Sequence, residues 1–293
     1  MQRPTIQKPT PRAPSGLPGN VSLGNWGNDI SGEKVIVYAE SGMGKTTLAT
    51  MAPEPAFIGL DDGGRKLRNP ITNEPLMCLQ INDKTAPNGA RNPRTFEEVR
   101  ALIQAAIDLP CQSVVLDTAT KLEPLAEDYV LRTVAGPQGA RAANLEAYGY
   151  GKGYKHLYDA MGLPLLDFDR LVATGKNVIV LCQSINAKVA NPEGEDFVRD
   201  DLRLYHSNSW SVRSQWAEWA DHVLRIAYQG VFVNKQNKQD RTGKAAGDTT
   251  RVIHADAEVY FRAKSRTLGE PVISFSEPGD DSLWRLMFDS EEQ

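Results

Sequence analysis

One short stretch of the chain, "AESGMGKTT", carries residue types that bind phosphate groups. Gly42 and Gly44 allow the backbone to curl closely around phosphate oxygens, and the N–H groups at the start of a following helix attract negative charge. At this spacing Lys45 would contact the β- and γ-phosphates of a nucleotide, and the hydroxyl of Thr46 would ligate Mg²⁺. We therefore predict a nucleotide-binding loop made of Ala39, Glu40, Ser41, Gly42, Met43, Gly44, Lys45, Thr46 and Thr47.

The loop departs from the usual Walker A pattern at its first position, where Ala39 replaces glycine. Alanine adds only a methyl group, at the point where the preceding strand ends rather than at a phosphate contact. We therefore expect the loop to tolerate the substitution. An ordinary glycine-rich turn is the alternative interpretation, and the strand–loop–helix context argues against it.

A second stretch with metal-binding chemistry is "SVVLD", residues 113–117. Four apolar or small residues followed by an aspartate are typical of a Walker B strand, which holds Mg²⁺ through a coordinated water. A buried strand that ends in a turn aspartate would give the same pattern. Because a phosphate-binding loop lies upstream, we predict that Asp117 is the metal-side carboxylate.

ATP hydrolysis also needs a group that orients the attacking water. Asp61 ends the apolar run "PAFIGL" and is our candidate for this base, although Asp-Asp-Gly-Gly is also ordinary turn chemistry. Gln183 ends the run "NVIVLCQ" and could contact the γ-phosphate and report its loss to the residues beyond. A polar residue at a strand terminus is the alternative for Gln183.

The stretch "EVYFRAKSR" near the C-terminus alternates apolar and basic residues. As a strand it would place Arg262, Lys264 and Arg266 on one face. The usual interpretation of such a stripe is a solvated strand face. The functional one is that Lys264 and Arg266 form a pair of cationic fingers that stabilise transition-state charge at the γ-phosphate of a neighbouring subunit. That role requires an oligomer with its sites at the subunit interfaces.

Strand-like and helix-like segments alternate along most of the chain. Apolar runs predict strands at residues 34–39, 55–60, 76–81, 113–117 and 177–183. Apolar spacing and capping residues predict helices at 45–52, 95–110, 121–134, 156–173 and 211–223. Residues 184–207 read as a long polar loop, and 222–228, 251–266 and 271–276 as final strands. The alternation predicts an α/β fold with a mostly parallel central sheet, helices on both faces and an antiparallel C-terminal extension.

Composition limits the other function classes. The chain has 293 residues and a net charge of −4, so bulk charge favours neither a nucleic-acid binder nor a membrane-surface protein. The first twenty residues hold five prolines, three basic residues and no acid, and we expect residues 1–28 to be a disordered arm. Residues 29–293 would form one ATPase domain. No apolar run approaches the length of a membrane span, which indicates a cytoplasmic protein without a membrane partner.

Taken in order, these motifs resemble those of the RecA-like ATPases, and in particular the phage-encoded RecA-core proteins of the single-strand annealing and recombination type. The stretches that match are "YAESGMGKTTLA", "AFIGLDDGG", "VVLDTAT", "YGYGKGYKHLYD", "NVIVLCQS" and "AKSRTLGEP". The resemblance implies ATP and Mg²⁺ as cofactors, a homo-oligomeric ring or filament, and a location in the cytoplasm of a bacterial host. It also implies that Asp61 matches a strand-end catalytic acid that is often Glu, and that Lys264 and Arg266 match a finger pair acting in trans.

The same resemblance implies that loops after the strands ending at Asp117 and Gln183 bind single-stranded DNA. The first loop carries three basic residues and three tyrosines, which suit backbone neutralisation and base stacking. These residues are Arg141, Lys152, Lys155, Tyr148, Tyr150 and Tyr154. A third candidate is the stretch 234–251, with five basic residues and two acids. Mobile solvated loops are the alternative for each.

Four functions are compatible with these patterns. We favour an oligomeric ATPase that binds single-stranded DNA and serves phage annealing or recombination. A ring helicase or helicase-loading motor would share the finger pair. A small-molecule phosphotransferase would need an arginine-rich lid and an acceptor pocket, neither of which we can identify in the sequence. A nucleotide-gated structural protein with little turnover is compatible with the shorter Asp61.

Overall fold

The computed structural model describes residues 32–60, 63–229, 232–234, 244–246 and 249–288. Strand β1 (Lys34–Ala39) lies inside a nine-stranded sheet, between β7 (Asn177–Val189) and β9 (His222–Tyr228), and runs parallel to both. The sheet continues beyond β7 with three more parallel strands, β6 (Ser113–Asp117), β2 (Pro55–Gly59) and β3 (Met77–Cys78). Beyond β9, it continues with two antiparallel strands, β12 (Arg251–His254) and β13 (Val272–Ser274).

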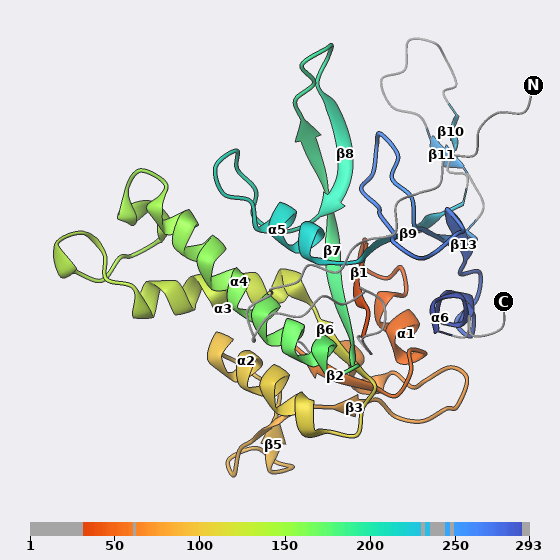
Figure 1. The fold of residues 1–293 in the computed structure, drawn as a ribbon, viewed down its shortest axis with the longest axis horizontal. Coiled ribbons are helices and arrows are strands. Elements are labelled where there is room, and N and C mark those ends of the chain that lie inside the picture. The colour runs from red at the N-terminus through yellow and green to blue at the C-terminus, as the bar shows by residue number, and fades with distance from the viewer. Residues whose placement is uncertain (1–31, 61–62, 230–231, 235–243, 247–248, 289–293) are drawn as a thin grey trace, which may run out of the picture. The chain divides into compact units, whose positions relative to one another are not determined.

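This topology confirms the predicted α/β class with a mostly parallel sheet and an antiparallel extension (Figure 1). One detail differs. Strand β9 is parallel to β1, so of the three final strands that were predicted, only the last two form the antiparallel part. The neighbouring strands β9, β1, β7, β6, β2 and β3 all run the same way. Their carboxyl ends therefore meet at one edge, where ligands of open α/β sheets bind.

Helices cover both faces of the sheet, as predicted. One face packs against α2 (Phe96–Ala105), α3 (Ala119–Thr133), α4 (Lys152–Ala173) and α5 (Val212–Trp219). The other face packs against α1 (Lys45–Thr50) and α6 (Ser282–Phe288). The strands alternate between the two cores: in β1, Ile36 and Tyr38 belong to the first and Val35 and Val37 to the second.

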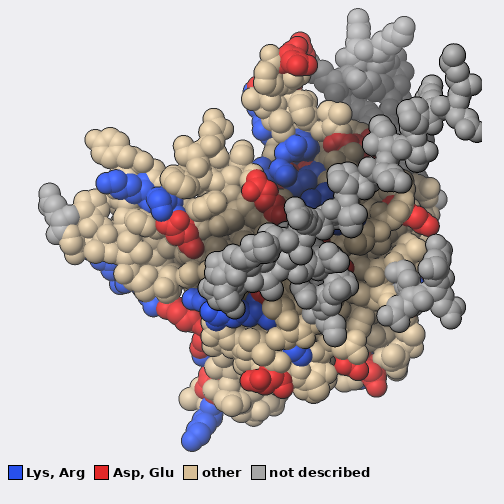
Figure 2. Space-filling model, viewed as in Figure 1, with Lys and Arg blue, Asp and Glu red and all other residues tan. Residues whose placement is uncertain are grey.

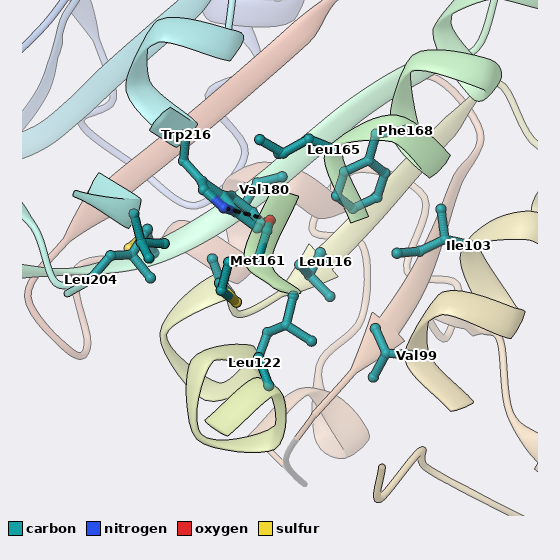
Figure 3. Packing of buried hydrophobic residues seen from close by; sticks show 14 of the residues in the cluster. Val99, Ile103, Leu116, Leu122, Met161, Leu165, Phe168, Val180, Leu204 and Trp216 are labelled. Atoms are coloured by element: carbon teal, nitrogen blue, oxygen red, sulfur yellow. Dashed lines mark hydrogen bonds between the residues drawn. The ribbon is translucent and has the colours of Figure 1, made fainter. Parts of the chain in front are cut away.

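Trp216 of α5 ties the larger core together. Its side chain is fully buried, and its indole N–H donates to the carbonyl of Met161 in α4 at 3.1 Å (Figure 3). Leu165 and Phe168 from the same helix lie around it. A buried indole with a satisfied N–H fixes the position of α5 on α4.

Capping residues set the ends of the helices on this face. Thr95 accepts the N–H of Glu98 at 3.2 Å, which confirms the predicted start of α2. Helix α3 begins two residues earlier than expected because Thr118 caps it by accepting the N–H of Lys121. Helix α4 begins four residues early, at Lys152. Its first turn packs so tightly that a Cβ on Gly153 would lie 2.1 Å from the carbonyl oxygen of Leu145, which explains a glycine where the sequence suggested a loop.

The predicted polar loop at 184–207 is wrong. Strand β7 continues to Val189 and pairs with β8 (Phe197–Leu202) in an antiparallel hairpin that projects from the sheet (Figure 1). The hairpin extends beyond the parallel strands, and β8 is the ninth strand of the sheet. Away from its buried base, the hairpin is largely accessible to solvent and needs no continuous apolar run. The apolar content of the segment was therefore too low to reveal it.

Three further predictions also need correction. The strand expected at 76–81 is split into β3 and β4 (Ile81–Asn82), and β4 pairs with β5 (Ala90–Arg91). The strand expected at 251–266 ends at His254, after which only isolated bridges form. Helix α5 ends at Trp219, before the predicted limit of 223. The remaining elements are η1 (Gly63–Lys66), η2 (Ala106–Asp108), η3 (Pro137–Gly139), η4 (Leu145–Tyr148), β10 (Phe232–Asn234) and β11 (Lys244–Ala246).

The expected arm at residues 1–28 lies outside the described residues. Within the part of the chain that the structure describes, none of the helices combines the length and the apolar character that crossing a membrane requires.

Candidate nucleotide-binding site

The phosphate-binding loop connects the end of β1 to the start of α1, at the carboxyl edge of the sheet. Gly42 and Gly44 have φ angles of 83° and 92°, in the left-handed region that favours glycine. A Cβ on Gly44 would lie only 2.6 Å from Nη1 of Arg251 and 3.0 Å from the ring of Phe275. Both the backbone angle and the close neighbours therefore require glycine at position 44.

Ala39 occupies the last position of β1, opposite Gln183 of β7. Its side chain is buried in the core that α1 covers, together with Leu48 and Ala49. The methyl group thus contributes to packing beneath the loop. The geometry is consistent with the expectation that alanine can replace glycine here.

The Lys45 ammonium lies inside the curve of the loop. It donates to the carbonyl oxygens of Ala39 at 2.9 Å and Glu40 at 2.8 Å, and to Oε1 of Gln183 at 3.2 Å. Burial lowers the pKa of Lys45 below its ordinary value, and the Asp117 carboxylate acts in the opposite direction. Lys45 was predicted from the phosphate-binding loop and Gln183 from the end of a strand, and the two side chains are in contact.

Thr46 and Asp117 also meet. The Thr46 hydroxyl donates to Oδ2 of Asp117 at 2.9 Å, and Asp117 ends β6 at the same edge of the sheet. A hydroxyl and a carboxylate oxygen at this separation are the hard ligands that Mg²⁺ prefers. The described residues contain no group of three His, Cys, Asp or Glu that could hold a metal alone, so a cation here would also need phosphate and water oxygens. The residues present fit a Mg²⁺–nucleotide.

Gln183 is held from two sides by groups that the sequence analysis did not identify. Its N–H donates to Oγ1 of Thr120 at 3.0 Å, and its carbonyl accepts the N–H of Arg203 at 2.8 Å. It is the residue at which β7 leaves its pairing with β1 and begins its pairing with β8. The Gln183 side chain therefore contacts Lys45 while its backbone lies at the base of the projecting hairpin.

Asp61, the candidate base, lies outside the described residues. The chain is described as far as Leu60, whose N–H donates to the carbonyl of Asp117 at 2.8 Å. The role assigned to Asp61 stays a prediction.

The two candidate fingers lie elsewhere in the chain. The backbone of Lys264 pairs with Val223, which lies opposite Ile36 in the first half of β1. At about 3.3 Å per residue this point is roughly 10 Å from Ala39 along the strand. Lys264 and Arg266 are thus at the amino end of the central strands, whereas the phosphate-binding loop is at the carboxyl end. One chain does not bring the fingers to its own loop.

Each finger has a partner at that amino end. The Lys264 ammonium donates to the carbonyl of Glu218 at 3.2 Å, and Nε of Arg266 lies 3.3 Å from a carboxylate oxygen of Asp221. Burial lowers the pKa of Lys264, and the neighbouring Arg266 cation lowers it further. Arg262, expected on the same face, is instead paired with the buried Asp201, at 2.7 Å and 3.2 Å.

Arg251 is a contact of the loop that the sequence analysis assigned elsewhere. It belongs to the basic stretch 234–251 proposed for DNA, but its Nη1 donates to the carbonyl of Met43 at 3.3 Å and its guanidinium stacks 4.7 Å from the centre of the Phe275 ring. Arg251 therefore supports the phosphate-binding loop from β12. Residues 235–243, 247 and 248 of that stretch lie outside the described residues.

The tyrosines predicted to contact DNA divide into two groups. Tyr148 is buried, and its hydroxyl donates to the carbonyl of Val134 at 2.8 Å, so it cannot stack on a base. Tyr150 is fully exposed, with a φ angle of 50°. Tyr154 stacks on Tyr205, with ring centroids 4.4 Å apart and planes 5° apart.

Trp210 extends this group of rings. It lies 5.6 Å from the ring of Tyr158, and the Lys155 ammonium lies 5.3 Å above it. We use the term aromatic surface for Tyr154, Tyr158, Tyr205 and Trp210. The aromatic surface thus combines residues of α4 with residues of the segment that precedes α5.

Basic residues accompany the aromatic surface. Arg141, Lys152 and Lys155 are all exposed, and Figure 2 shows Lys and Arg atoms gathered over the loops that join α3 to α4, with acidic atoms beside them. The hairpin tip has the opposite character, because Glu193, Glu195 and Asp196 lie there (Figure 2). Of the segment after Gln183, only the part near Tyr205 and Trp210 therefore fits a polyanion.

Together, the parallel sheet, the left-handed glycines of the loop and the Lys45–Gln183 and Thr46–Asp117 contacts define an α/β P-loop fold with a nucleotide-binding site. The chain belongs to the AAA domain family, whose model matches residues 31–267.

Two solved structures are similar to this chain. A RadB recombinase is 14% identical, with 76% of this chain and 80% of that chain covered and a TM-score of 0.40. A KaiC-like protein from the hyperthermophilic archaeon Pyrococcus horikoshii is 11% identical, with 84% and 90% covered and a TM-score of 0.39. None of the curated proteins compared with the chain matches it.

Proposed function

We propose that this protein is an oligomeric ATPase that binds single-stranded DNA and promotes annealing or recombination in phage DNA metabolism, in the host cytoplasm. The observation that carries the proposal is the convergence of Lys45, Thr46, Asp117 and Gln183 at the ends of three parallel strands. This set contains a phosphate-binding cation, two hard oxygen ligands and an amide that can sense a terminal phosphate.

The residues of the site have different roles in nucleotide binding. The N–H groups of the loop and the Lys45 ammonium hold the phosphate charge, and Lys45 exchanges its contact with Gln183 for one with the nucleotide. Thr46 and Asp117 would hold Mg²⁺, which would offset the negative charge of the phosphates. Bound ATP supplies the phosphoryl group that is transferred to water. Asp61 is the proposed base for that water, and Gln183 transmits the loss of phosphate to the hairpin base.

The aromatic surface supports the choice of single-stranded DNA as the partner. Tyr150 is exposed, and Tyr154, Tyr158, Tyr205 and Trp210 are partly exposed. Their rings offer flat faces for unpaired bases, and the exposed Arg141, Lys152 and Lys155 would neutralise phosphates. The Gln183 carbonyl accepts the N–H of Arg203 at 2.8 Å, and Tyr205 lies two residues after Arg203. The proposed DNA surface and the phosphate sensor are therefore linked across the base of the hairpin. Stimulation of hydrolysis by DNA would follow from this connection.

The position of the finger pair supports an oligomer. Because Lys264 and Arg266 lie at the amino end of the strands, they can reach only the phosphate-binding loop of another copy. Arg266 is well exposed, with 65% of its side chain accessible, and so is available to a neighbour. In this arrangement each ATP is held by one subunit and its transition-state charge is stabilised by the next.

The test is to measure phosphate release from ATP and Mg²⁺ with and without single-stranded DNA, for the wild type and Lys45→Ala. We expect DNA to stimulate release and Lys45→Ala to abolish it. The same preparations are then given complementary strands and a forked duplex. Annealing without unwinding supports the proposal. Unwinding would identify a helicase motor instead, and tight ATP binding without phosphate release would identify a nucleotide-gated protein.

A further inference from the structure

We propose that Ser265 and the buried His222 are positioning residues for the finger pair, linked through Glu33 to the start of the central strand. The proposal rests on the function of Lys264 and Arg266 proposed above. Ser265 lies between the two fingers in the sequence. Its side chain contacts the buried His222, whereas Lys264 and Arg266 contact Glu218 and Asp221.

His222 opens β9 and is fully buried. Its Nδ1 lies 3.0 Å from Oγ of Ser265, and its Nε2 lies 3.0 Å from Oε2 of Glu33. Oγ of Thr267 is a more distant neighbour of Nε2, at 3.5 Å. The imidazole thus joins the finger segment to the residue that precedes β1.

Ser265 has polar partners on two sides. Its Oγ lies beside Nδ1 of His222 and accepts the N–H of Leu268 at 2.9 Å. On the other side of the imidazole, Nε2 faces the Glu33 carboxylate, so both ring nitrogens have a polar partner. These contacts hold the Ser265 side chain and the turn that follows Arg266.

The backbone and the neighbouring side chains need this anchor. Lys264 exchanges two backbone hydrogen bonds with Val223, at 2.8 Å and 3.0 Å, and beyond it regular pairing stops. Lys264 and Arg266 must each leave a resting partner, the Glu218 carbonyl or Asp221, to reach a phosphate of another subunit. While they exchange partners, Ser265 is the side chain that holds the segment in place.

The resting partners and the anchor all come from one short piece of chain, the junction between α5 and β9. Glu218, Asp221, His222 and Val223 span six positions. A finger segment held at one site by a buried imidazole keeps its two cations within the small positional error that catalysis tolerates. The inferred function of His222 and Ser265 is therefore to hold the backbone of the finger segment, so that less free energy is needed to place the Lys264 and Arg266 cations at the phosphate. Neither residue contacts the nucleotide.

The test compares Ser265→Ala, Ser265→Thr and Arg266→Ala with the wild type, in the full chain with ATP, Mg²⁺ and single-stranded DNA. We expect Ser265→Ala to lower kcat about 10-fold with KM for ATP changed less than about twofold, because only transition-state charge placement is lost. Ser265→Thr keeps the hydroxyl and should recover most of the rate. Ser274→Ala, which removes an exposed serine bonded to Asp280, is the matched control and should behave as the wild type.

A mixing experiment separates positioning from a general loss of stability. Lys45→Ala subunits have intact fingers but no working loop, so adding them to Ser265→Ala subunits should raise phosphate release per Ser265→Ala site. If Arg266→Ala is impaired, two results would overturn the inference. They are no gain in phosphate release on mixing, and a wild-type kcat in Ser265→Ala. A wild-type kcat in Arg266→Ala would instead overturn the function proposed for the fingers.

Discussion

The two ends of β1 differ in how complete their chemistry is. At the carboxyl end, Lys45, Thr46, Asp117 and Gln183 contact one another within a single chain. At the amino end, Lys264 and Arg266 are held by Glu218 and Asp221, and no phosphate-binding loop lies near them among the described residues. One end has the contacts of a nucleotide-binding site, and the other has two cations held by resting partners. Under the proposed function, nucleotide binding belongs to one subunit and fast turnover requires two.

The largest expected effect is at the complete end. Lys45→Ala removes the cation that three acceptors hold inside the loop, and we expect phosphate release to fall by at least about 100-fold. Lys84→Ala, which changes an exposed lysine in the connection between β4 and β5, is the matched control and should have no effect. Phosphate release at saturating ATP checks both. A Lys45→Ala protein with wild-type turnover would contradict the assignment of this loop.

The next effect sharpens the contrast between the ends. Arg266→Ala should lower kcat by about 100-fold while leaving ATP affinity unchanged, because the lost charge acts only in the transition state. Equilibrium binding of a fluorescent ATP analogue and steady-state phosphate release provide the two readouts. Weaker binding in Arg266→Ala, with kcat preserved, would mean that the arginine serves ground-state binding instead.

A smaller effect tests the geometry of the loop. Gly44→Ala places a Cβ in a left-handed conformation and against Arg251 and Phe275, and we expect it to destabilise the fold by roughly 1–3 kcal/mol and to weaken nucleotide binding. Gly269→Ala is the matched control, because its added Cβ would meet no atom within 4 Å and its φ is not positive. Urea unfolding measures the difference. Equal stability of the two variants would contradict the account of the loop.

The smallest effect concerns the aromatic surface. Tyr205→Ala removes one ring of the stacked pair with Tyr154 and should weaken binding of single-stranded DNA by about 1–3 kcal/mol, with phosphate release in the absence of DNA unchanged. Tyr228→Ala changes a half-exposed tyrosine at the end of β9 and serves as the control. Fluorescence anisotropy with a labelled oligonucleotide checks the prediction. Equal affinities of the two variants for the oligonucleotide would contradict the assignment of the aromatic surface as the DNA-binding site.

Much of the complete end could be predicted from sequence because its residues lie at the ends of buried strands. An apolar run followed by Asp117 or Gln183 specifies both a strand and the edge at which its polar terminus lies. The fold class followed from the alternation of such runs with helices. Thr120 and Arg251 were missed because their contacts with Gln183 and Met43 depend on tertiary packing, which no local pattern encodes.

The errors have the same physical origin. The β7–β8 hairpin lies beyond the sheet, and its solvated strands lack the apolar run of a buried strand. Tyr148 was expected at the DNA surface because it lies in a polar, glycine-rich segment, but the carbonyls at the end of α3 accept its hydroxyl and bury its ring. The finger segment was predicted as a continuous strand, whereas its pairing is limited to isolated bridges held by His222 and Ser265.

The central claim is that a complete active site needs two subunits, and one mixing measurement tests it most directly. Lys45→Ala lacks a working loop and keeps its fingers, and the double variant Lys264→Ala, Arg266→Ala keeps its loop and lacks fingers. We expect each to be inactive alone and their mixture to recover DNA-stimulated phosphate release, because fingers of the first complete the site of the second. No recovery in a mixture that forms joint oligomers, or full activity of the double variant alone, would contradict the account.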